Sequence, residues 1–195
     1  MTLETVGAGP ADLATPAAAR AGVALQNWFL SETPSLNGQT LWLRQGERAL
    51  AADLSSGGDQ VILGTDHRIR LYDSAGNELA VREVPTAAWG VVMVPDRPLA
   101  VVAHGDGSIR WYSLRADLPL AELAGLFLHR DGRRWVAWTA DGFFAHSDFG
   151  GEAPVGFQQN GTRQAPTGQW LSFEQVYRLF YDPVCVSAAL DRPDD

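Results

Sequence analysis

The stretch Asp66–Asp73, DHRIRLYD, returns later in the chain as Gly107–Ser113, GSIRWYS. When Ile69 is aligned with Ile109, the offset between the two copies is 40 residues. Both copies alternate apolar and polar side chains over a short length, which is the pattern of a half-buried β-strand. The chain therefore contains an internal repeat, and its period indicates the fold.

The similarity extends beyond the two strands. Each copy follows a turn and an apolar strand, VILGTD at residues 61–66 and LAVVAHGD at residues 99–106. A third, shorter copy covers residues 127–142, FLHRDG followed by WVAWTADG, with Gly142 placed 35 residues after Gly107. A period near 40 with three or four short antiparallel strands is typical of a β-propeller blade, whose apolar faces are buried only when blades stack.

We therefore predict an all-β fold of about three to four antiparallel blades, forming a partial or assembled propeller, with a short C-terminal helical appendage. Three regions are expected. Residues 1–35 form an Ala- and Pro-rich segment with a short helix across 16–30, residues 36–147 form the blades, and residues 148–195 contain a Gly- and Pro-rich loop and a helix on the blades. The helix is expected at 172–181, where apolar residues follow Ser172 at helical spacing.

Composition excludes several classes of function. The 15 basic and 23 acidic side chains give a formal charge of −8, which disfavours binding to nucleic acid or to an anionic membrane. No apolar run is long enough to cross a membrane. The single cysteine, Cys185, has no second thiol for an internal disulfide. We expect a cytoplasmic protein that needs no cofactor.

One block of the sequence resembles a known family. LFLHRDGRRWVAWTADGFF at residues 126–144, followed by FYDPV at 180–184, is similar to a segment of bacterial proteins that join WD-repeat propeller blades to a caspase-like peptidase domain. The resemblance covers residues 36–190 and matches the non-catalytic part of those proteins. It implies WD-repeat-like blades and a role beside a caspase-like protease, in signalling or defence.

Residues with catalytic or metal-binding chemistry are few and scattered. Cys185 lies in the apolar DPVCVSAAL, where no caspase-type cysteine context is present, so we interpret it as structural. The four histidines share no metal-ligand spacing, and no metal site is predicted. Four aspartates recur near turns, and we interpret them as turn residues: Asp53, Asp66, Asp106 and Asp141.

The most consistent interpretation is a non-enzymatic protein-interaction or regulatory module, because loops on a rigid β scaffold suit protein recognition. The predicted partner-binding residues are aromatic or turn residues of the blades: Trp89, His104, Asp106, Trp138, Asp141, Phe143 and Phe144. Two alternatives stay open. One is a hydrolase with a site near His146, Asp148 and Glu152. The other is a structural subunit that completes a propeller by oligomerisation through open blade edges.

Overall fold

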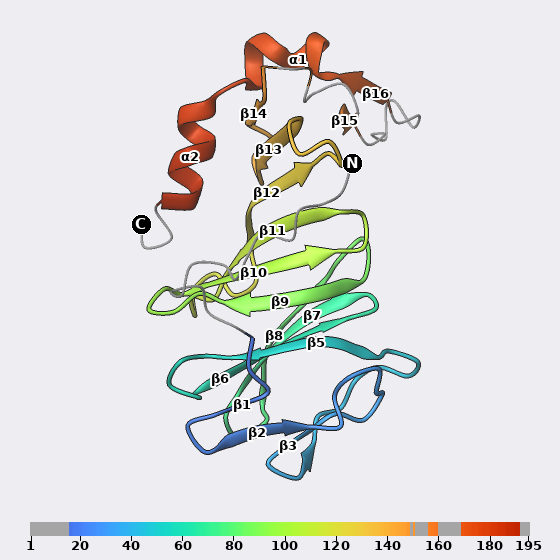
Figure 1. The fold of residues 1–195 in the computed structure, drawn as a ribbon, viewed down its shortest axis with the longest axis vertical. Coiled ribbons are helices and arrows are strands. Elements are labelled where there is room, and N and C mark those ends of the chain that lie inside the picture. The colour runs from blue at the N-terminus through green and yellow to red at the C-terminus, as the bar shows by residue number, and fades with distance from the viewer. Residues whose placement is uncertain (1–15, 149, 151–155, 160–168, 192–195) are drawn as a thin grey trace.

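A computed structural model of the chain describes residues 16–148, 150, 156–159 and 169–191. Within these residues, three antiparallel sheets are stacked along the long axis of the molecule, and two helices follow the last sheet (Figure 1). The prediction of an all-β array of blade-like sheets with a short helical appendage is confirmed.

Each sheet is a meander in which strands that follow one another in sequence are hydrogen-bonded neighbours. The first sheet contains β1 (Ala19–Arg20), β2 (Val23–Gln26), β3 (Ser35–Leu36) and β4 (Gln39–Thr40). The middle sheet contains β5 (Ala49–Leu54), β6 (Gln60–Thr65), β7 (Arg68–Asp73) and β8 (Glu78–Glu83). The third contains β9 (Ala88–Met93), β10 (Leu99–His104), β11 (Ser108–Ser113), β12 (Glu122–Leu128), β13 (Trp135–Thr139) and β14 (Phe144–His146). A separate hairpin pairs β15 (Gly156–Gln159) with β16 (Gln169–Ser172).

Strands β5, β6 and β7 of the middle sheet are buried on both faces, which explains the nearly continuous apolar sequence of β5 and β6. All six residues of β5 are buried. Alternate residues of β6 belong to different cores: Val61 and Leu63 pack with the first sheet, whereas Ile62 packs with the third. Successive side chains of a strand point to opposite faces, so this alternation places one core on each side of the sheet.

The first sheet corrects the prediction of a helix across residues 16–30. Strands β1 and β2 occupy that segment, and they are joined by a tight turn at Ala21 and Gly22, which both have positive φ. The alternating burial of Val23 and Leu25 fits a strand that packs on the middle sheet. Tertiary burial of these two side chains therefore outweighs the helix propensity of the Ala-rich sequence. Residues 1–15 of the predicted N-terminal segment lie outside the described residues.

The third sheet corrects the reading of residues 127–142 as a shorter blade of their own. Its strands β12, β13 and β14 continue the sheet of the second repeat, so that one sheet has six strands. The register is regular from Leu128 opposite Trp135 to Ala124 opposite Thr139. The third copy resembles the others because it uses the same hairpin chemistry, not because it forms another layer.

A helix lies in the predicted segment 172–181, and a second helix, which the sequence analysis did not predict, follows it. Helix α1 (Phe173–Phe180) begins after Ser172, whose backbone N–H donates to the Gln175 side chain (2.8 Å), and α2 (Pro183–Asp191) follows. Tyr177 and Tyr181 contact the Phe144 ring edge-on, at centroid distances of 5.9 and 5.7 Å. Aromatic side chains of α1 and the residue after it therefore pack against the third sheet.

Candidate interaction sites

The structure brings together three of the predicted partner-binding residues at one rim of the third sheet. Trp89, near the start of β9, is 57% exposed. Its indole lies beside the β10–β11 hairpin, where a Cβ on Gly105 would be 3.4 Å from Nε1 of Trp89. The Gly105 N–H donates to the carbonyl of Ala87 at 2.8 Å, which ties the hairpin to the segment before Trp89. We call Trp89 and the Gly105–Gly107 hairpin the rim surface.

His104 lies directly before this hairpin turn, and Asp106 lies within it. His104 is 5% exposed, and its Nε2 lies 3.0 Å from the Tyr112 hydroxyl. Burial, and then the positive charge of Arg110, lower the pKa of His104. The His104 side chain is therefore a neutral, buried group, and its contact with a partner stays a prediction.

Asp106 acts as a turn residue with an ionised side chain. Its carboxylate accepts the Ser108 N–H (2.9 Å) and hydroxyl (2.6 Å), and it pairs with Arg110 at 3.1 Å. Partial burial raises the pKa of Asp106, but these bonds and the Arg110 charge lower it further, so the net shift is downward. Asp106 is an exposed residue of the rim surface.

The remaining predicted residues lie apart from the rim surface, at β13 and β14. Trp138 and Phe144 are opposite each other in the register, and Phe144 is fully buried. Trp138 covers Gly125, where an added Cβ would lie 2.3 Å from the indole, and Arg110 lies over its ring. Phe143 packs edge-on against Phe180 at 6.2 Å. The buried side chain of Phe144 has no exposed surface in the structure, and a role in partner binding stays a prediction for the four residues of this region: Trp138, Asp141, Phe143 and Phe144.

The turn prediction for the four aspartates holds for three of them. Asp66, Asp106 and Asp141 lie in hairpin turns, and Asp141 is exposed. Asp53 does not. It lies inside β5, is 1% exposed, and accepts backbone N–H groups of Ala17 (2.8 Å), Leu54 (2.9 Å) and Met93 (2.7 Å). This one carboxylate connects β5 of the middle sheet to β9 of the third sheet and to the segment that precedes β1.

The residues of the hydrolase alternative do not form a described catalytic group. His146 is surrounded by aromatic rings, with Tyr177 and Tyr181 at centroid distances of 5.9 and 5.3 Å, and its Nδ1 lies 2.8 Å from the Ser147 carbonyl. Asp148 is exposed, and Glu152 lies outside the described residues. In the part of the chain that the structure describes, no three His, Cys, Asp or Glu side chains are placed to hold a metal ion.

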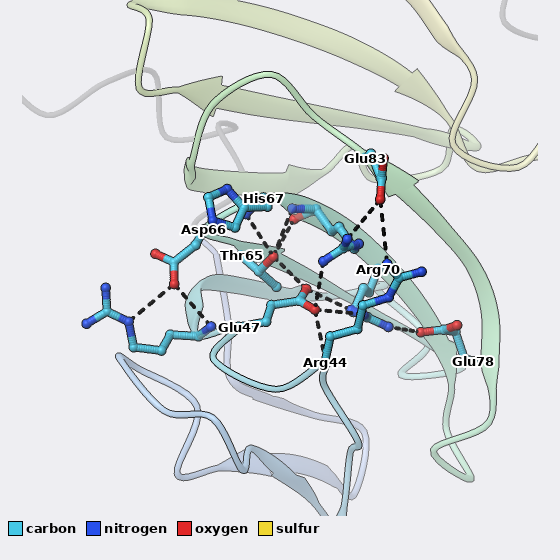
Figure 2. A network of polar contacts seen from close by, with 10 residues as sticks. Arg44, Glu47, Thr65, Asp66, His67, Arg70, Glu78 and Glu83 are labelled. Atoms are coloured by element: carbon cyan, nitrogen blue, oxygen red, sulfur yellow. Dashed lines mark hydrogen bonds and ion pairs between the residues drawn. The ribbon is translucent and has the colours of Figure 1, made fainter.

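A buried ion network that sequence reasoning missed joins the connection between β4 and β5 to the middle sheet (Figure 2). Glu47, in the connection before β5, is 3% exposed. One carboxylate oxygen accepts Arg70 Nε (2.9 Å) and the Thr65 hydroxyl (2.7 Å), and the other accepts Arg70 Nη2 (2.7 Å) and the Arg44 N–H (3.1 Å). Burial raises the pKa of Glu47, but the bonds from Arg70, Thr65 and Arg44 lower it to about 2.

The network extends outward through exposed carboxylates. Arg68 pairs with Glu83 at 2.8 Å, and Arg70 also pairs with Glu78. The repeated Arg110 of the third sheet pairs instead with Glu122 and Asp106, because the register places Thr86, which is not a carboxylate, where the middle sheet has Glu47. The network is structural: every Glu47 oxygen is already satisfied, which leaves no group for a ligand.

Comparisons with known proteins assign the chain to no family. No family model matches the chain. No curated protein matches it either. Among solved structures, a chain of "Crystal Structure of Mitotic Checkpoint Complex" is similar over 60% of this chain and 40% of its own length, with 13% identity and a TM-score of 0.38. The class of the protein, an array of stacked antiparallel blades, therefore follows from its own sheets.

No helix among the described residues is long and apolar enough to span a membrane.

Proposed function

We propose that the chain is a protein-interaction module whose rim surface binds a protein partner. The observation that supports this proposal most directly is Trp89, a large aromatic side chain that is 57% exposed on a rim held in place by a short hairpin. Tryptophan is enriched among the residues that dominate binding energy at protein interfaces. The neighbouring hairpin restricts the indole before binding, so less conformational entropy is lost when a partner covers it.

The partner that we propose is a caspase-like peptidase. Support comes from the sequence alone, in the resemblance of residues 126–144 and 180–184 to the blade-bearing part of bacterial proteins that carry such a peptidase. The module restrains or senses the peptidase through contacts and contributes no catalytic group. Binding of this kind needs only the exposed surface and a rigid scaffold.

The test uses the purified protein and a purified caspase-like peptidase domain from a protein of that architecture. Affinity is measured by calorimetry, and peptidase activity is followed with a fluorogenic peptide. We expect Trp89→Ala to weaken binding at least tenfold. The matched control is Leu118→Ala, which removes an apolar side chain of similar exposure (50%) in the β11–β12 connection and is expected to leave affinity unchanged.

Each outcome decides a different part of the proposal. Binding that Trp89→Ala and Leu118→Ala weaken equally would rule out the rim surface as the site. No binding to the peptidase would remove that partner, and no change in fluorogenic turnover on binding would remove the restraining role.

A further inference from the structure

The outer edge of the middle sheet differs from the outer edge of the third. Strand β8 is the last strand of its sheet, whereas β12, in the equivalent position, is covered by β13. The two strands are related in sequence, since both begin Glu-Leu-Ala, at residues 78–80 and 122–124. Both also carry an irregularity opposite the repeated tyrosine, Tyr72 or Tyr112. The pairing of β12 with β13 therefore shows how another strand could add to the outer edge of the related strand β8.

The free hydrogen-bonding groups of β8 can be identified from its pairing. Val84 directs its N–H inward to the carbonyl of His67 at 3.0 Å. Because residues of an antiparallel strand alternate between bonding one neighbour and the other, Arg82 also bonds inward, and Val81 and Glu83 direct their N–H and C=O groups outward. Within the described part of the chain, no strand pairs with that outer side.

Apolar side chains are exposed along the same edge. Leu79 is 48% exposed, Val81 is 44% exposed and Trp42 is 81% exposed. The segment that contains Trp42 runs alongside β8. At one end, the Leu41 side chain would lie 3.2 Å from a Cβ on Gly76, and at the other, Arg44 lies 3.7 Å from Glu83. We call the outer backbone of β8, with Trp42, Leu79 and Val81, the edge surface.

We propose that the edge surface binds an extended peptide segment of a partner protein by antiparallel strand addition. The free N–H and C=O groups of Val81 and Glu83 bond the peptide backbone, and the exposed apolar side chains contact alternate peptide residues. A second copy of β8 is a poor occupant. Pairing two copies about the middle of the strand places Glu78 of one opposite Glu83 of the other, and like charges opposite each other are destabilising.

The β12–β13 pair also indicates which peptide sequence fits. Gly125 lies opposite Trp138, whose indole occupies the space that a Cβ would need. The register makes Val81 the equivalent of Gly125, because Val81 is opposite Arg70 as Gly125 is opposite Arg110. The Val81 side chain fills that space on β8. The bound peptide must therefore carry a small residue opposite Val81, where β13 has tryptophan.

This inference rests on the proposed function only in that both make the chain an interaction module. The edge surface is a different strand in a different sheet from Trp89. Loss of binding at one surface therefore leaves binding at the other as an independent measurement.

The probe is a fluorescein-labelled synthetic peptide with the sequence of residues 133–140 in which Trp138→Ala supplies the small residue. Binding to the full chain is followed by fluorescence anisotropy. We expect saturable binding to the wild type, and at least tenfold weaker binding to Val81→Pro, which removes one outward N–H while leaving the inward ladder intact. Val81→Thr, which keeps the N–H and the branched shape, is the matched control and is expected to bind as the wild type does.

Two further measurements separate the proposal from a folding defect. The unaltered peptide, with Trp138, is expected to bind the wild type at least tenfold more weakly than it binds Val81→Gly. A Trp138→Ala peptide that is N-methylated on the amides facing β8 is expected not to bind the wild type. Equal affinity for Val81→Pro and Val81→Thr, or no saturable binding to the wild type, would overturn the inference. Trp89→Ala is expected to bind the peptide normally.

Discussion

At the scale of single residues, Gly64 decides how closely the middle and third sheets approach. A Cβ at this position would lie 2.6 Å from the Ala88 carbonyl oxygen and 2.9 Å from its Cβ. The obstacle is backbone of the next sheet, which cannot move aside as the end of a side chain can. Glycine is required here for close packing and not for a turn.

We therefore expect Gly64→Ala to destabilise the protein by about 1–3 kcal/mol, the usual cost of overpacking a core. The control is Gly90→Ala in β9, where the added Cβ would meet only the Ala103 methyl, at the ordinary distance of 3.5 Å. Urea unfolding of both variants measures the difference. If the two variants had the same urea midpoint, the middle and third sheets could move apart at Gly64 with little loss of stability.

The Glu47 carboxylate makes stability depend on pH. Its pKa is about 2 in the folded protein against an ordinary value of 4.5, so folding favours the ionised form. The stabilisation, of the order of 3 kcal/mol, is fully present above the unfolded-state pKa and is lost as pH falls from about 5 towards 2.

Glu47→Gln tests this effect. The variant is expected to lose about 3–5 kcal/mol at pH 7, because Arg70 stays buried without its partner, and to show a flatter stability profile between pH 5 and pH 2. Unfolding free energies at several pH values provide the measurement. Glu83→Gln, which changes a 73% exposed partner of Arg68, should cost less than about 1 kcal/mol. A Glu47→Gln profile as steep as the wild type would assign the acid sensitivity to another group.

At the scale of elements, the inner strands are held together by Asp53. One oxygen of its carboxylate accepts the N–H groups of Ala17 and Leu54, and the other accepts the N–H of Met93 on β9. Strands in different sheets do not form a backbone hydrogen-bond ladder with each other. A buried carboxylate that accepts N–H groups from both strands joins them instead.

Asp53→Asn is expected to cost about 2–4 kcal/mol, since the amide has one acceptor oxygen and places donor hydrogens against an N–H group. Thermal unfolding followed by circular dichroism measures the loss. Asp59→Asn, in the exposed turn that follows β5, is the matched control and is expected to change stability by less than about 0.5 kcal/mol. If both variants have the same melting temperature, the hydrogen bonds of Asp53 do not stabilise the contact between the sheets.

At the scale of the whole molecule, the outer face of the third sheet lacks the residues that would let a further sheet pack closely against it. In the register, Ala103 takes the place of Gly64 and Val92 takes the place of Asp53. The methyl of Ala103 blocks the close approach that Gly64 allows, and Val92 cannot accept an N–H from another sheet. The outer face therefore lacks both features that join the middle sheet to the third.

This difference argues against the structural-subunit alternative, in which copies complete a propeller. We expect the purified protein to have the mass of a single chain in light scattering, at all concentrations up to about 100 µM. A stable dimer that dissociates on Ala103→Lys, in the centre of that face, would contradict the expectation and would favour a role in assembly.

The sequence by itself determined the blades, most of their hairpins and the start of the C-terminal helix. A repeated strand, turn residues with positive φ and the Ser172 boundary are local signals, and local geometry suffices to produce the elements that they predict. The residues that link elements carry no such signal. The partner of Glu47 is 23 residues away at Arg70, and Asp53 bonds Met93 across 40 residues.

Only the tertiary structure decided which sheet each strand joins. The Ala-rich segment at 19–26 became two strands because Val23 and Leu25 are buried against the middle sheet. The third repeat extended the second because β12 offered a free edge to β13. In both places the local sequence permits more than one structure, and burial and backbone pairing across the chain select among them.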